Sequence, residues 1–172
     1  MSGICHVLLV VLLLIPTLME ERTKSQIDYA KQLSPHASNN NYSPSQLLKD
    51  WPSAELVTDN PKEKFKEYRV GMGPSVSFYS FHENKILGQL RHYPFGVAND
   101  HLRKLEERLG KPDTAELTKE DKEDGVMKRY RWSFKDADIN VIGSISMQNN
   151  TPTYSVTVIN RTNYAEATKG SP

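Results

Sequence analysis

The chain has almost no cysteine. Cys5 is the only one, and it lies at the start of an N-terminal apolar stretch. The rest of the chain therefore cannot form an internal disulfide, supply a cysteine nucleophile or hold a metal through thiolates. Because small secreted domains of eukaryotes usually carry disulfides, this absence favours a protein of the bacterial envelope.

An excess of charge of one sign is also missing. The 172 residues include 22 Lys and Arg against 21 Asp and Glu. A general nucleic-acid binder normally carries a basic excess, so we expect no nucleic-acid partner. Without the N-terminal stretch and the C-terminal tail, about 120 residues remain, enough for one modest hydrophobic core.

Motifs of catalysis and metal binding are missing too. The chain has no phosphate-binding loop, no dinucleotide glycine pattern and no nucleophile elbow. The acidic run at residues 120–125 fails as an EF-hand, because Lys122 and Arg131 fall where acidic ligands are required. The histidines are widely spaced, so we expect no metal, no cofactor and no identifiable catalytic residue.

One apolar run is present, at residues 7–15. Its length fits the core of a secretory signal and falls short of a comfortable membrane span. No Lys or Arg precedes the run, and Pro16-Thr17-Leu18-Met19 is a poor cleavage site. Residues 1–19 are therefore predicted to be a signal peptide or an uncleaved anchor, with a misassigned start or a buried helix as alternatives. We expect export to the bacterial periplasm or envelope, with membrane contact if the segment stays uncleaved.

The segments before and after the main domain are predicted to be flexible. Residues 20–42 are charged and then polar, which predicts a flexible tether with one brief helix at 26–33. Residues 163–172 are predicted to be a disordered tail.

Residues 43–162 predict an α+β domain. A helix beginning at Ser43-Pro44 is followed by strands at 65–70, 76–81 and 86–93. A second helix, capped by Asn99 or Asp100 and ending at Gly110, precedes three strands with period-two apolar faces. Those faces are formed by Val126, Tyr130, Trp132 and Phe134, by Ile139, Val141, Ile145 and Met147, and by Tyr154, Val156 and Val158.

A faint internal repeat connects the two parts. Ser53-Ala54-Glu55-Leu56 is similar to Thr114-Ala115-Glu116-Leu117, and residues 65–70 are similar to residues 127–132. We therefore predict two helix–three-strand units, 43–95 and 96–162, that form an antiparallel sheet with both helices on one face. Chance similarity between two ordinary α+β halves is the alternative to duplication.

The second unit also resembles known envelope proteins over about 65 residues. A short helix closes in Leu109-Gly110-Lys111-Pro112, and three strands follow, the first with Tyr130 and Trp132. This pattern is similar to assembly lipoproteins of the SmpA/OmlA type and to the tandem units of the β-lactamase-inhibitor-protein fold. The lipoprotein cysteine is absent after the apolar run. The resemblance implies a duplicated helix-and-sheet architecture in the envelope and transfers no contact residue.

Two surfaces are candidate binding sites. The first hairpin is apolar on both faces, which predicts an exposed patch of Tyr79, Phe81, Arg91, His92 and Tyr93. Alternatively, the segment before residue 43 folds over these aromatics. The second surface is the polar face of the last three strands. Such a face is more often simply solvated than a binding site, and this one contains Arg129, Arg131, Asn140, Ser144, Ser146, Thr153, Ser155 and Thr157.

These observations predict an exported or membrane-tethered module that binds another protein, as an inhibitor, an immunity factor or an envelope-assembly accessory. A small envelope hydrolase is the first alternative, and it requires a pocket that brings a histidine and a carboxylate together. A purely structural envelope component is the second.

Overall fold

The computed structural model describes residues 21–72, 76–117, 126–148 and 151–169. These residues form an α+β fold with one antiparallel sheet of eight strands, in the order β1-β2-β3-β4-β8-β7-β6-β5. The strands are β1 Glu55–Asn60, β2 Phe65–Val70, β3 Ser77–His82, β4 Lys85–Tyr93, β5 Thr114–Leu117, β6 Val126–Phe134, β7 Ile139–Gln148 and β8 Thr151–Asn160. The helices are α2 Lys24–Leu33, α3 Pro44–Asp50, α4 Ala98–Leu109 and α5 Arg161–Ala167, with 3-10 turns at Phe95–Val97 and Lys135–Ala137.

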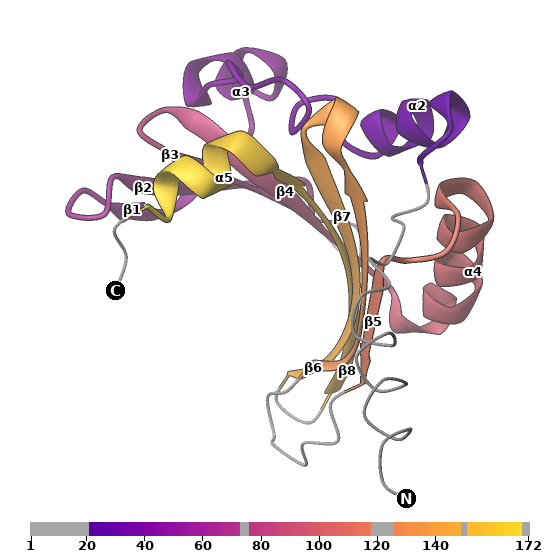
Figure 1. The fold of residues 1–172 in the computed structure, drawn as a ribbon. Helices are drawn as coiled ribbons and strands as arrows, with labels where there is room; N and C mark the ends of the chain where they lie inside the picture. Colours follow the sequence, from indigo (N-terminus) through magenta and orange to yellow (C-terminus); the bar gives the residue numbers. More distant parts are fainter. Residues whose placement is uncertain (1–20, 73–75, 118–125, 149–150, 170–172) are drawn as a thin grey trace, which may run out of the picture.

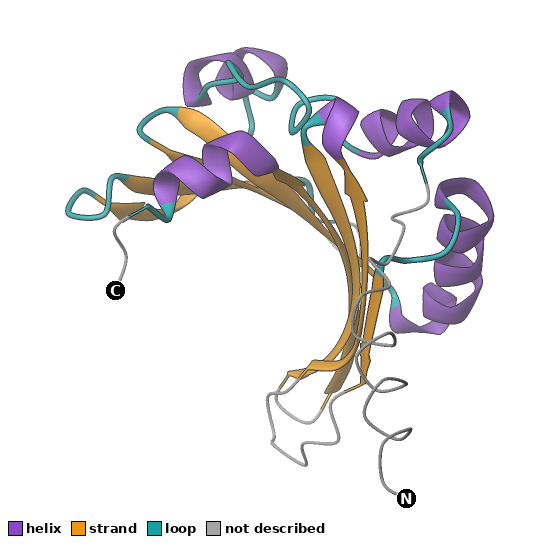
Figure 2. Cartoon of the chain, viewed as in Figure 1, coloured by secondary structure: helices purple, strands orange, loops and turns teal. Residues whose placement is uncertain are grey.

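The sheet is strongly curved. Helices α2, α3 and α4 lie on its outer side, which we name the convex face, and α5 lies on the inner side, the concave face (Figure 1). Figure 2 shows the same arrangement by element type, with most of the helical structure outside the arc of strands. The two helices that were predicted to share one face, α3 and α4, both lie on the convex face; α2 lies there as well, and α5 lies on the opposite face.

Each half of the sheet has four strands, so the predicted helix–three-strand units are wrong. The additional strands, β1 and β5, are the two edges of the sheet. The described side chains of both are mostly exposed, so neither has the alternation of buried and exposed residues by which inner strands are recognised. The halves share the order helix then four strands, and they meet at β4 and β8. This order fits the duplication hypothesis, which stays a prediction.

The convex face holds the core in two clusters. The larger lies beneath α2 and α4, where Leu105 and Leu109 pack over Trp132, Phe134 and neighbouring strand residues. The smaller lies beneath α3, and it consists of Tyr42, Leu47, Tyr68, Val70, Tyr79, Phe81 and Ile86. The predicted apolar faces of the last strands are buried as expected at Trp132, Phe134, Ile139, Val141, Ile145, Tyr154, Val156 and Val158. The Val126 side chain lies outside the described residues.

The predicted tether is part of the fold. Helix α2 begins at a capping box formed by Thr23 and Gln26, and Ala30 is buried. The chain after α2 buries Ser34, Ala37 and Tyr42 as it crosses the convex face. Small and polar residues pack here, and their low hydrophobicity explains why the composition read as flexible.

The predicted tail is helical up to Ala167. Asn163, in the first turn of α5, is buried, and its side-chain amide donates to the backbone oxygens of Asn40 and Ile86. The N-terminal prediction, including Cys5, concerns residues outside those described. Within the part that the structure describes, no helix is long and apolar enough to span a membrane.

Candidate functional site

The structure buries the two central residues of the predicted patch. Tyr79 and Phe81 are only 3% and 1% exposed. His36 lies edge-on to Tyr79, with 5.9 Å between ring centroids, and Tyr42 stacks on Phe81 at 6.4 Å. The expected exposure is therefore wrong, and the alternative, that the segment before residue 43 folds over these aromatics, describes the arrangement. Burial raises the pKa of the Tyr79 hydroxyl.

The other three residues of the predicted patch do not gather into one site. Arg91, half-buried, donates from Nε to the hydroxyl of Ser77 at 3.2 Å. Tyr93 packs against His101 beneath the convex face, with ring centroids 4.6 Å apart. His92 alone turns to the concave face, where it is directly opposite Ser155.

The concave face contains a hollow that the sequence patterns did not predict. Its volume is about 380 Å³, and strands β2, β3, β4 and β8 form its floor, with α5 as one wall. We name it the concave hollow; it is lined by Phe65, Glu67, Phe78, Ser80, Leu87, Gly88, Leu90, His92, Thr157, Ile159 and Tyr164. The sequence signal for it was the first hairpin, which is apolar on both faces because one face enters the core and the other lines this hollow.

An irregularity in β4 shapes the floor. The pairing of β3 with β4 shifts after Ser80, so the consecutive residues Leu87 and Gly88 both line the hollow. Glycine is required by space: a Cβ at position 88 would lie 2.7 Å from the backbone oxygen of Val158. The bulge therefore adds an apolar side chain and keeps the floor open beside it.

The polar groups of the hollow are separated from one another. Glu67 accepts a hydrogen bond from Ser80 Oγ at 3.0 Å, and His92 lies edge-on to Phe78 at 5.8 Å. Burial lowers the pKa of His92, so its ring is neutral at pH 7. Glu67 on β2 is paired with Ser80 on β3, which is paired with Gly88 on β4. His92 lies four residues beyond Gly88, so the backbones of Glu67 and His92 are roughly 16 Å apart.

This separation gives no acid–base pair, since such a pair needs hydrogen-bond contact. The described residues also contain no cluster of three His, Cys, Asp or Glu side chains that could hold a metal ion.

The second predicted surface is continuous with the hollow. Leu90 pairs with Thr157, Thr157 with Ile142, and Ile142 with Arg131. Directly paired residues of an antiparallel sheet project from the same face, so the concave face runs from apolar over β2–β4 to polar and basic over β6.

Comparison with known proteins adds little. No family model matches the chain, and no curated protein matches it. Among solved structures, the chain is similar to a DUF4309 family protein (YjgB) from Bacillus subtilis subsp. subtilis str. 168. The identity is 15% and the TM-score 0.46, over 80% of this chain and 99% of that one.

Proposed function

We propose that this protein is an exported or membrane-tethered module that binds another protein through the concave face of its sheet. The concave hollow is the observation that supports the proposal. Aromatic and aliphatic side chains gather there on the face that α2, α3 and α4 leave open, whereas an ordinary solvated sheet face would be polar. The apolar run at residues 7–15 supports export or tethering.

The size and lining of the hollow fit one side chain of a partner protein. A few hundred cubic ångströms lined by Phe78, Leu90 and Tyr164 can take one large apolar side chain, and such buried anchors dominate protein interfaces. Tyr164 is 48% exposed, so a bound side chain would cover apolar surface that is now in water. The hollow gives the hydrolase alternative no support, because His92 and Glu67 are too far apart to exchange a proton directly.

A peptide library tests the proposal. Random twelve-residue peptides displayed on phage are selected on the immobilised full-length protein, and the affinities of the enriched peptides are measured in solution. We expect Phe78→Asp and Tyr164→Ala each to weaken binding at least about tenfold, since both remove apolar contact from the hollow. Leu48→Asp is the matched control, because Leu48 is exposed on α3 of the convex face.

Tyr164→Ala also guards against misfolding, because the side chain is half-exposed on a terminal helix. The proposal would be overturned if the enriched peptides bound the Leu48→Asp variant more weakly than the parent protein and bound both hollow variants as tightly as the parent. Failure to enrich any peptide would count against it equally.

A further inference from the structure

We infer that the partner segment is extended and carries a carboxylate four residues from the apolar side chain that enters the concave hollow, with Arg131 as the group that binds the carboxylate. This inference rests on the proposed function and specifies the chemistry of its partner. The concave face provides three observations for it: one row of paired residues, the length of that row and its charges.

The row crosses the sheet at right angles to the strands. Each member is paired directly with the next, so all project from the concave face: Arg69, Phe78, Leu90, Thr157, Ile142 and Arg131. Phe78, Leu90 and Thr157 line the hollow. A segment that lies along this row therefore meets the apolar anchor point between two guanidinium groups, those of Arg69 and Arg131.

The spacing sets the separation of the two partner groups. Leu90 on β4 and Arg131 on β6 are three strand intervals apart, because β8 and β7 lie between them. At the usual distance between neighbouring strands this is about 14 Å. An extended chain covers that length in about four residues, and residues four apart in an extended chain point to the same side.

The charges distinguish one end of the row from the other. Arg69 forms an ion pair with Glu55, and Arg129 lies 3.9 Å from Glu116. The Arg131 side chain is exposed, and its guanidinium has no hydrogen-bond or ion-pair partner among the described residues. The backbone oxygen of Arg131 accepts a hydrogen bond from Asp113 N. Glu67, on the floor of the hollow, repels a second carboxylate there, so an acidic group is directed toward Arg131.

The test uses peptides enriched on the full-length protein as described above. We expect an Asp or Glu four residues from an apolar residue to recur among them. Replacing that acid by its amide should weaken binding to the parent protein about fivefold, as for a solvent-accessible ion pair. It should have no effect on binding to Arg131→Gln, and Arg131→Gln should itself weaken binding of the acidic peptide by the same factor.

Arg69→Gln is the matched control, because its arginine ends the same row and is already paired. Equal affinities of the acidic and amide peptides for the parent, or equal losses in Arg69→Gln and Arg131→Gln, would overturn the inference. If binding still depends on Phe78, the proposed function survives that result. Decanoate is the remaining probe: binding of this fatty acid that depends on both Phe78 and Arg131, with no peptide enriched, would overturn both proposals in favour of a lipid ligand.

Discussion

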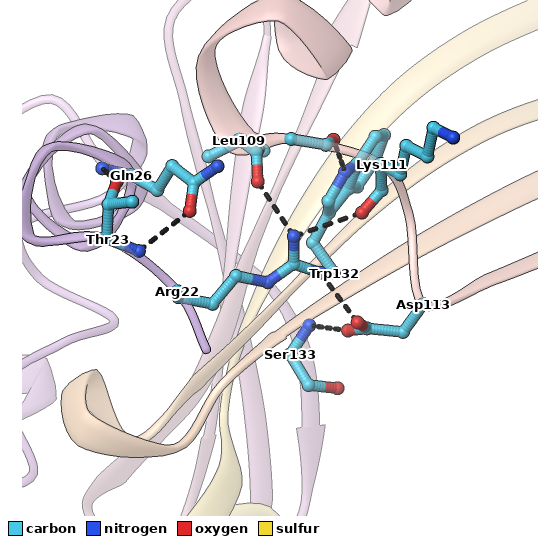
Figure 3. Close-up of polar contacts among 9 residues, drawn as sticks. Arg22, Thr23, Gln26, Leu109, Lys111, Asp113, Trp132 and Ser133 are labelled. Atoms are coloured by element: carbon cyan, nitrogen blue, oxygen red, sulfur yellow. Dashed lines mark hydrogen bonds and ion pairs between the residues drawn. The ribbon is translucent and has the colours of Figure 1, made fainter. Parts of the chain in front are cut away.

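Arg22 and Asp113, 91 positions apart in the sequence, form an ion pair with 2.6 Å between Nη2 and Oδ1 (Figure 3). The same guanidinium donates through Nη1 to the backbone oxygens of Leu109 at 2.9 Å and Lys111 at 3.0 Å. Carbonyls at the end of a helix have no partner within it, and they carry partial negative charge. Arg22 therefore fastens the residues before α2 to the C-terminal end of α4.

The first prediction concerns this fastening. Arg22→Ala removes the cation from the two carbonyls and Asp113, and we expect it to lower the free energy of unfolding by about 2 kcal/mol. Urea denaturation measures the loss as a lower midpoint at an unchanged slope. Lys24→Ala, at the exposed first residue of α2, is the control and should shift the midpoint little. Equal effects of the two substitutions would show that the contacts of Arg22 do not stabilise the fold.

The second prediction concerns the glycine that ends α4. Gly110 has φ +79°, and a Cβ there would lie 2.6 Å from the Gln26 amide nitrogen and 3.2 Å from Arg22 Nη1. Gly110→Ala should therefore destabilise by about 1 kcal/mol or more, because it strains the backbone and displaces both neighbours. At Gly96 a Cβ meets nothing within 4 Å, so Gly96→Ala is the matched control. Thermal unfolding of the two variants compares them directly, and a lower melting temperature for the Gly96 variant would contradict the argument.

The parts of the fold that were predictable are those whose pattern is local. The leucine stripe of α4, its stop at Gly110 and the period-two faces of β6, β7 and β8 depend on neighbours within a few residues. The cover over Tyr79 and Phe81 depends instead on contacts across the whole chain. Asn160, for example, donates from its side chain to the backbone oxygen of Ala37 at 2.9 Å, a contact across 123 positions.

The candidate site was half predictable for the same reason. Apolar residues on both faces of the first hairpin indicate that both faces are used, and they do not say which face the N-terminal segment covers. That choice requires knowing where α3 and Tyr42 pack. The edge strands and α5 give weak local signals, since most of their described residues are exposed.

The third prediction tests the burial of Phe81 against its predicted role in binding. Phe81→Ala should lower the free energy of unfolding by about 3–5 kcal/mol, because it opens a cavity under Tyr42 and Tyr68. Phe95→Ala is the control, since Phe95 is 45% exposed and should cost far less. Chemical denaturation measures both. A Phe81 variant as stable as the Phe95 variant would mean that the ring is outside the core.

The last prediction concerns pH. Burial, and secondarily the charge of Lys104, lowers the pKa of His101, which lies between Tyr93 and Tyr154 with Nδ1 3.2 Å from the Tyr154 hydroxyl. Burial also lowers the pKa values of His36 and His92, although Asp50 opposes it at His36. The unfolded chain therefore takes up protons at about pH 6.5, before the folded protein does. The free energy of unfolding should therefore keep its full histidine contribution above that pH and should fall as the pH decreases through it.

His101→Phe isolates the contribution of His101 to the pH dependence of the free energy of unfolding. The substitution keeps an aromatic ring between the two tyrosines and removes the titrating group. The variant loses the hydrogen bond to Tyr154 and should be less stable than the parent at pH 7.5. Between pH 7.5 and pH 5.5 it should then lose less stability than the parent, as measured by urea denaturation at each pH. The sign follows from linkage: a histidine that binds protons more weakly when folded stabilises the native state only while it is neutral. An identical decrease in parent and variant would show that His101 has the same pKa in the folded and unfolded chains, and would assign the whole effect to other groups.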